Sequence, residues 1–197
     1  MKKRMLFTTL LCLTFMISFF GYRHFHTQEL RVDGKEKLYS LNELEQMATL
    51  IVRGTLSEKV STDIVFDNEK VPSEFKTYST FVVQKVYKPK NTSVINKDKI
   101  KVVEWYADWR DISGAYRIVG NEVYIPLKDN KEYVLFLYNE PGKDYYEIIG
   151  LQQGKYNFDK AKVKDGSVLT DDLAALEINE RDPYYEEKYK QVFEKYK

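Results

Sequence analysis

Residues 76–88 read KTYSTFVVQKVYK, a run rich in β-branched and aromatic side chains that ends before Pro89. Such side chains favour extended backbone, and proline cannot donate the next hydrogen bond of a sheet. We therefore expect a strand here that is long enough to curl around a small barrel. The run indicates a mainly β fold of the α+β kind.

Similar patterns lie on both sides of this run. Residues 50–56 alternate between apolar and polar positions, which is the period of a half-buried strand. Gly54 lies inside that pattern, where a glycine usually marks a bulge or a sharp bend. Further strand candidates are residues 100–106, 132–138, 145–149, 155–158 and 161–164.

Turn residues separate these candidate strands. The pair Pro141-Gly142 suits a type II turn, and Asp165-Gly166 suits a type I′ hairpin that leads into residues 167–169. Several short strands with such turns predict a small antiparallel barrel, closed or partly open. Residues 107–131 interrupt the pattern and are too polar and irregular to assign.

Two helices are expected beside the strands. Ser40 and Glu43 fit a capping box, which predicts a short helix over about residues 41–48. Asp182-Pro183 reads as the cap and first residue of a C-terminal amphipathic helix. Its apolar side chains recur at intervals of three and four residues: Tyr185, Tyr189, Val192, Phe193 and Tyr196. We expect this stripe to pack on the barrel, and the alternative is a helix that binds a partner.

The amino terminus predicts a membrane segment. Residues 5–22 carry no charge and follow the basic cluster Lys2-Lys3-Arg4. A helix of this length roughly matches the ~30 Å hydrocarbon core of a bilayer. The basic cluster would stay cytoplasmic, so we expect a single-pass anchor in the cell membrane with the C-terminal domain outside. The alternative is a signal peptide that is cleaved, which would leave the protein secreted.

Composition then divides the chain into four parts. Residues 1–22 form the signal anchor or signal peptide, residues 23–37 a polar stalk, residues 38–169 the barrel domain and residues 170–197 a C-terminal helical segment. The first 26 residues hold four of the 31 basic residues and no acidic one, so the remainder has 27 basic against 30 acidic residues. This balance argues against nucleic-acid binding.

The expected domain lacks the residues that several classes of enzyme require. Cys12, in the apolar run, is the single cysteine of the chain, so the exported domain has neither a disulfide nor a thiol nucleophile. His24 and His26 are the two histidines, and both precede the domain, which excludes a Ser-His-Asp hydrolase there. As a pair without a further ligand they make a poor metal site.

Acidic residues suggest two further kinds of site, a calcium site and a pair of catalytic carboxylates. Asp63, Asp67 and Glu69 could hold calcium, but their spacing does not match an EF-hand loop, so we expect a solvated strand end or loop. Asp108 and Asp111 could serve as the paired carboxylates of a glycoside hydrolase. We expect no metal and no cofactor.

Four segments carry a resemblance to known proteins: MATLIVRGTL at residues 47–56, FVVQKVYK at 81–88, KEYVLFL at 131–137 and GLQQGKY at 150–156. They resemble a group of bacterial extracytoplasmic proteins whose cores are similar to the OB-like barrel of tissue metalloproteinase inhibitors and netrin modules. The resemblance covers about residues 40–165 and implies a small OB-like barrel flanked by helices, with no settled activity. Those inhibitors act through a free amino-terminal cysteine and depend on disulfides, which this chain lacks, so no functional residue is carried over.

The stretch WYADWRDISGAY, residues 105–116, is the strongest candidate for recognition. Aromatic side chains on the strands and loops of OB-like barrels bind sugars, peptides or single strands, and Trp and Arg are frequent hot-spot residues. The alternative is that these aromatic residues fill or close the barrel. The predicted ligand-binding or partner-binding residues are Trp105, Tyr106, Trp109, Arg110 and Tyr116.

We therefore expect a non-catalytic binding or interaction module at the cell envelope, whose partner is an envelope protein or glycan. One alternative is a carboxylate-dependent hydrolase that acts on envelope polysaccharide. Another is an inhibitor or immunity-type protein. Fold alone does not choose among these functions.

Overall fold

The computed structural model describes residues 28–32, 37–89, 93–111, 114–121, 124–159, 163–164, 167–168 and 183–197. The predicted membrane or signal segment and both histidines lie outside these residues, as does the beginning of the predicted C-terminal helical segment. Within the described residues, no helix has the length and apolar character needed to cross a membrane.

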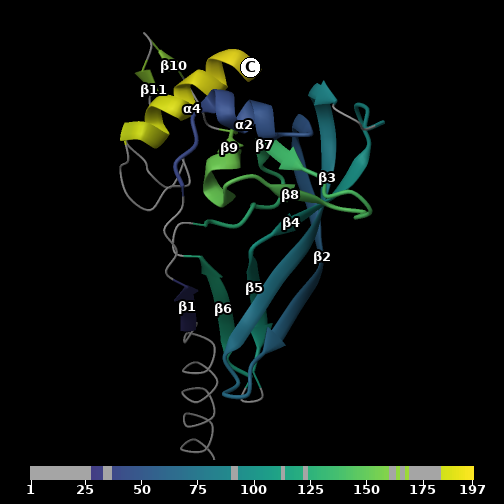
Figure 1. Ribbon diagram of the computed structural model, residues 1–197, viewed down its shortest axis with the longest axis vertical. Helices are drawn as coiled ribbons and strands as arrows, with labels where there is room; N and C mark the ends of the chain where they lie inside the picture. Colours follow the sequence, from purple (N-terminus) through teal and green to yellow (C-terminus); the bar gives the residue numbers. More distant parts are fainter. Residues whose placement is uncertain are drawn as a thin grey trace, which may run out of the picture.

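Six strands form the main sheet (Figure 1). They are β2 (Leu50–Phe66), β3 (Pro72–Pro89), β4 (Lys99–Glu104), β7 (Glu132–Tyr138), β8 (Tyr146–Ile148) and β9 (Lys155–Asn157). Their order is β2-β3-β4-β8-β7-β9, and β7 pairs with β2 as well. The pairings therefore lead from β2 through β3, β4, β8 and β7 back to β2.

The sheet is mixed, and the expectation of a purely antiparallel sheet is wrong. Strand β8 pairs with β4 in parallel, with Val102 opposite Tyr146, whereas every other pair of this sheet is antiparallel. The reason is the number of strands in the circuit. Direction reverses at each antiparallel pair, so a circuit of five strands returns to its starting direction only if one pair is parallel.

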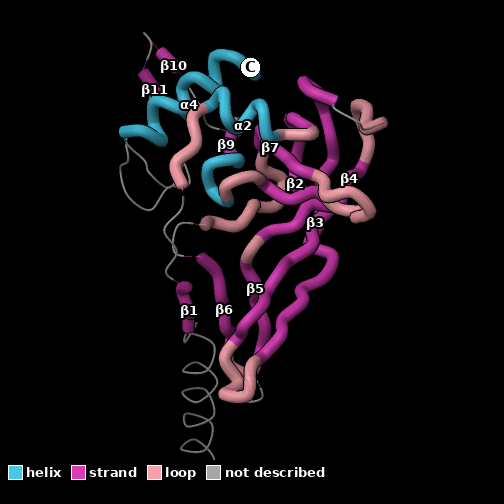
Figure 2. The backbone as a smooth tube through the Cα atoms, in the orientation of Figure 1, coloured by secondary structure: helices cyan, strands magenta, loops and turns pink. Residues whose placement is uncertain are grey.

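A second sheet has the order β1-β6-β5. Its strands are β1 (Gln28–Val32), β5 (Tyr106–Arg110) and β6 (Tyr116–Asn121), with β1 parallel and β5 antiparallel to β6. Strands β5 and β6 occupy part of the range 107–131 that the sequence left unassigned, and β1 lies within the predicted stalk. Figure 2 shows this sheet beside the far end of β2 and β3.

Strands β2 and β3 form a long hairpin that projects beyond the main sheet (Figure 1). We call residues 57–66 of β2 and 72–76 of β3 the arm. The predicted irregularity at Gly54 is confirmed, because the register shifts between Arg53 and Gly54. A Cβ atom at Gly54 would lie 2.1 Å from the carbonyl oxygen of Val82, so the two strands approach too closely there for any other residue.

Both predicted helices are confirmed. Helix α2 (Leu41–Met47) begins with the capping box: the Glu43 amide donates to Ser40 Oγ at 3.3 Å, and the Ser40 amide donates to Glu43 Oε2 at 2.8 Å. Helix α4 (Pro183–Tyr196) begins at the expected proline. A short 3-10 helix, η1 (Leu151–Gly154), precedes β9.

The predicted turn at Pro141-Gly142 is found, and the strands on either side of the predicted Asp165-Gly166 turn are paired. Gly142 has φ of 87°, and the Lys143 amide donates to the Glu140 carbonyl at 3.1 Å, as a type II turn requires. Strands β10 (Val163–Lys164) and β11 (Ser167–Val168) pair antiparallel, as expected for the hairpin around residues 165–166.

Two apolar clusters meet at β7. Val134 and Phe136 belong to the cluster beneath α2 and α4, whereas Tyr133, Leu135 and Leu137 belong to a second cluster with side chains of β2, β3 and β4. The stripe of α4 packs as predicted, with Tyr185, Tyr189, Val192 and Tyr196 all buried. Strand β7 is thus buried on both faces, which explains its continuous apolar sequence.

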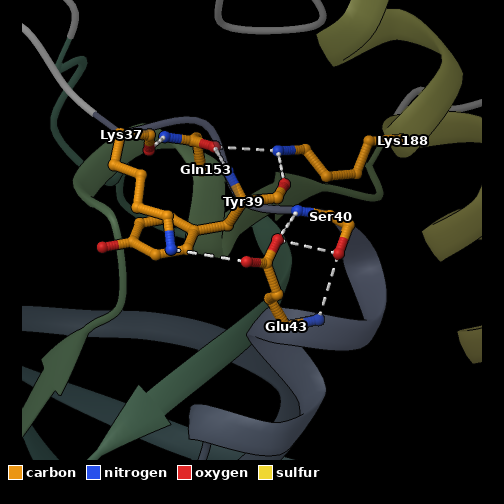
Figure 3. A network of polar contacts seen from close by, with 6 residues as sticks. All are labelled: Lys37, Tyr39, Ser40, Glu43, Gln153 and Lys188. Carbon is orange, nitrogen blue, oxygen red and sulfur yellow. Dashed lines mark hydrogen bonds and ion pairs between the residues drawn. The ribbon is translucent and has the colours of Figure 1, made fainter.

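Polar contacts fix α4 to the start of the domain (Figure 3). Buried Lys188 donates from Nζ to the Tyr39 carbonyl at 2.7 Å and to Gln153 Oε1 at 3.0 Å. The Gln153 amide group donates in turn to the Lys37 carbonyl at 2.8 Å, and Lys37 pairs with Glu43 at 3.4 Å. This network joins helix α4, the chain entering α2 and the 3-10 helix.

Candidate functional site

The end of the arm exposes apolar side chains. Val65 is 53% exposed, Phe66 45% and Val71 44%. We call these three residues the arm tip. Asp67 shapes the turn between them, since its Oδ1 accepts hydrogen bonds from the amides of Glu69 at 2.9 Å and Val71 at 2.8 Å. The apolar side chains are therefore presented on an ordered turn.

Trp109 connects the predicted site to the arm tip. Its ring meets the Phe66 ring edge to face, with centroids 5.9 Å apart. Strand β5 carries Trp109 and strand β2 carries Phe66, so the contact joins the two sheets. The sequence predicted Trp109 as a binding residue but contained no signal that would pair it with Phe66, which lies 43 positions away.

Side-chain contacts hold the end of the β5–β6 hairpin. Tyr116 donates its hydroxyl to Asp108, and the Arg110 guanidinium lies 5.9 Å from the centre of the Tyr116 ring. Burial raises the pKa of Tyr116 to about 12, and the hydrogen bond to Asp108 adds to this rise. Arg110 is exposed. Arg110 and Tyr116 thus lie with Trp109 at one end of β5 and β6.

Each carboxylate of the candidate hydrolase pair has its own structural partner. Asp108 accepts the hydroxyl of Tyr116, as described above. Asp111 pairs with Arg117 at 2.7 Å and accepts the Ala115 amide at 3.0 Å. Both carboxylates therefore hold the hairpin together.

The other two predicted residues lie elsewhere. Tyr106 is 3% exposed and belongs to the second apolar cluster, where its hydroxyl has no hydrogen-bond partner among the described residues. Burial raises the pKa of Tyr106, and the charges of Glu104 and Asp108 add to the rise. Trp105 lies under Lys76 of β3, with Nζ 4.4 Å from the ring centre. The five predicted residues therefore do not form one surface.

Acidic residues outnumber basic residues in the sequence around the arm tip. Residues 63–74 carry four acidic residues, Asp63, Asp67, Glu69 and Glu74, against one basic residue, Lys70. In the described part of the chain, no three His, Cys, Asp or Glu side chains gather as a metal site would require. The arm tip is thus an apolar centre in an acidic setting.

Glu104 is a buried carboxylate that the sequence reasoning missed. It is 0% exposed and accepts hydrogen bonds from Ser79 Oγ at 2.9 Å, the Tyr124 hydroxyl at 2.8 Å and the Leu127 amide at 2.7 Å. Burial raises the pKa of Glu104, although these hydrogen bonds and nearby Lys155 act in the opposite direction. The sequence signal that could have revealed this buried carboxylate is a glutamate directly after Val102 and Val103 in the strand KIKVVE.

The buried polar groups around Glu104 hold residues 124–128. The Ile125 amide donates to Gln152 Oε1 at 3.1 Å, and buried Lys155 donates to the Ile125 carbonyl. The Lys128 amide donates to the Tyr133 hydroxyl at 3.0 Å. Because this segment has no regular secondary structure, side chains supply the partners that its backbone would otherwise lack. Glu104 therefore has a structural role.

The fold defines a mixed β-sheet protein with two helices in its described residues and a projecting arm. No known protein-family model matches the chain, and a search of curated proteins finds no match.

Proposed function

We propose that the protein is a non-catalytic interaction module of the cell envelope that docks a partner protein through the arm tip and Trp109. The carrying observation is the exposed group of Val65, Phe66 and Val71 at the end of the arm, with Trp109 packed against Phe66. An apolar group at the end of a projecting hairpin adds little to the cores of its own chain. Its burial against another protein would be favourable.

The residues around the arm tip indicate what kind of surface the partner would present. An apolar pocket would accept Phe66 and Val71, and basic side chains around it would complement the acidic residues of the arm. Arg110 is exposed and Trp109 is half-buried. Arginine and tryptophan often contribute most of the binding energy of an interface. The acidic setting disfavours an anionic lipid surface as the target.

The wider architecture belongs to the same proposal. Five strands whose pairings return to β2 support an OB-like barrel, closed or partly open. We further propose that residues 5–22 anchor the protein in the cell membrane, or serve as a cleaved signal, and that the domain lies outside. An inhibitor or immunity-type protein would use the arm in the same way. The contacts of Asp108 with Tyr116 and of Asp111 with Arg117 give no support to polysaccharide hydrolysis.

Site-specific photocrosslinking in intact cells tests the docking. A photoreactive amino acid at position 71 should form one prominent adduct, and mass spectrometry should map it to an apolar patch with Lys or Arg beside it. Phe66→Ser should weaken capture of that partner at least tenfold, which corresponds to about 1.4 kcal/mol. Because Phe66 is exposed, the melting temperature should change by no more than a few degrees.

Ile95 provides the matched control, since it is 65% exposed but lies in the loop before β4. A photoreactive residue at position 95 should not give the adduct, and Ile95→Ser should capture the partner normally. The proposal is wrong if Phe66→Ser captures the partner as well as the unchanged chain does. An adduct that maps to an acidic surface would also contradict it.

A further inference from the structure

A groove is lined by residues of α2, the long strands β2 and β3, and α4. Figure 1 shows α2 and α4 at the opposite end of the molecule from the turn between β2 and β3. The volume of the groove is about 380 Å³, within the roughly 300–1,000 Å³ typical of small-molecule sites. The lining includes Asn42, Glu45 and Gln46 from α2, Ile51 and Tyr87 from the two long strands, and Tyr196 from α4.

Contacts between the walls keep the groove in shape. Tyr87 donates its hydroxyl to the Tyr196 carbonyl, and their rings meet edge to face with centroids 4.9 Å apart. Tyr196 donates its own hydroxyl to Glu45 Oε1 at 2.7 Å. These bonds join α4 to both β3 and α2, so a ligand would meet a site that is already formed.

The charged groups of the walls are already engaged. Glu45 forms an ion pair with Lys195 at 2.6 Å. Lys88 donates from Nζ to the Glu45 carbonyl. An ionic ligand would have to compete with these contacts, and this favours a neutral ligand.

Two amide side chains remain available. Asn42 and Gln46 are both exposed, and within the described part of the chain no hydrogen bond occupies either side chain. They lie four residues apart on α2, so they share one face of the helix. Each amide offers donors and an acceptor, and together they suit a ligand with several hydroxyl or acetamido groups.

We infer that this groove binds a neutral saccharide. The amides of Asn42 and Gln46 bind its hydroxyl or acetamido groups, and the half-buried ring of Tyr87 meets the C–H face of one of its sugar rings. The groove holds a single carboxylate, Glu45, in its lining. Glycoside hydrolysis normally requires two, so the groove binds the sugar without cleaving it.

A peptide is the competing occupant, because its backbone is also neutral and rich in hydrogen-bonding groups. The length of helix α2, which carries both amides, argues against a peptide. Helix α2 has seven residues and extends about 10 Å, which corresponds to about three residues of extended peptide. A short saccharide makes more hydrogen bonds over the same length.

Nuclear magnetic resonance of the full chain tests the inference directly. The protein is kept in dodecylphosphocholine micelles, a detergent without a sugar headgroup, and titrated with N-acetylglucosamine tetramer, maltotetraose or triglycine. The side-chain amide signals of Asn42 and Gln46, assigned from Asn42→Ala and Gln46→Ala, should shift with one of the two saccharides and not with triglycine. The double variant should bind that saccharide at least tenfold more weakly.

Gln191→Ala is the matched control, since Gln191 is an exposed amide on α4 outside the groove lining. It should bind the saccharide as the unchanged chain does. The inference is overturned if neither saccharide shifts the two amides at millimolar concentration, if triglycine shifts them equally, or if the double variant binds normally. These outcomes are independent of docking at the arm tip.

Discussion

Burial of Glu104 is costly, because a carboxylate loses its hydration when it is fully enclosed. Its two oxygens are used differently. Oε2 accepts from Tyr124 and the Leu127 amide, whereas Oε1 meets only Ser79 among the contacts described above. A proton on Oε1 could be donated to Ser79 Oγ without disturbing either bond to Oε2. This arrangement agrees with the raised pKa.

Glutamine should replace Glu104 well, because its oxygen can accept from Tyr124 and Leu127 while its NH₂ group donates to Ser79. We expect Glu104→Gln to change the free energy of unfolding by less than about 1 kcal/mol near pH 5, and Glu104→Ala to lower it by about 3 kcal/mol. Urea unfolding measures both values.

The pH dependence of Glu104→Gln has a defined sign. The pKa of Glu104 is higher in the folded chain than its ordinary value of 4.5, so its contribution is fully present below 4.5 and is lost as pH rises through the folded-state pKa. The glutamine variant should therefore gain stability relative to the unchanged chain between pH 4 and pH 8. Glu58→Gln, at an exposed position, should show no such trend. A relative stability of Glu104→Gln that falls with rising pH would refute this assignment.

At the scale of elements, the arm illustrates how irregular pairing protects a long hairpin. Strand β2 pairs with β7 only over Leu50–Thr55, so residues 57–66 have no partner strand opposite β3 among the described residues. Register shifts occur at Leu56/Glu58, Lys59/Ser61 and Val65/Phe66. Bulges interrupt the regular spacing of hydrogen-bonding groups and twist the edge of a strand. Both effects discourage another chain from adding a strand there. Docking through the side chains of the arm tip is consistent with this protected edge.

Helix α4 depends on its buried lysine. Lys188→Met keeps much of the side-chain volume but removes the hydrogen bonds to Tyr39 and Gln153 (Figure 3). We expect a loss of about 1–3 kcal/mol in unfolding free energy, because the buried Gln153 oxygen and the half-buried Tyr39 carbonyl each lose a donor. Amide hydrogen exchange should accelerate along α4 more than in β7.

Lys190→Met on the same helix is the control, since it makes the same chemical change at a half-buried position outside this network. It should leave exchange in α4 nearly unchanged. Equal acceleration by both variants would show that the network does not hold the helix.

At the scale of the whole molecule, the two apolar clusters depend on each other through β7. Helix α4 covers one cluster with Tyr185, Tyr189, Val192 and Tyr196. Burying each such side chain contributes roughly 1.5–3 kcal/mol, so together they approach the roughly 5–15 kcal/mol that stabilises a typical domain. The predicted boundary between a barrel domain and a C-terminal helical segment therefore separates parts of one core.

Removal of residues 183–197 should consequently disrupt the fold beyond the helix itself. We expect the truncated chain to lose its cooperative thermal transition and to bind the dye ANS, because Leu44, Phe136 and Tyr156 lose their cover. Circular dichroism and dye fluorescence measure these changes. Tyr184→Ala, at a position 40% exposed on the same helix, should melt normally. A truncated chain that melts cooperatively within a few degrees of the full chain would contradict the shared core.

Several elements were predictable from local sequence. The capping box of α2, the proline that starts α4, the turn at Gly142 and the irregularity at Gly54 all depend on chemistry within a few neighbouring residues. Strands β5 and β6 were missed because their Trp, Arg and Asp side chains obscure the alternation between buried and exposed positions. Strand β1 was missed because its partner β6 lies almost 90 residues away.

Local residue order thus specified the helices, most strands and the turns, since capping, periodicity and backbone restriction act over short distances. Tertiary structure decided which strands pair with one another and that one pair of the main sheet is parallel. It also placed Tyr106 in the core, buried Glu104, brought Trp109 to Phe66 and formed the amide-lined groove. These features depend on contacts between residues far apart in the chain, which composition and spacing do not encode.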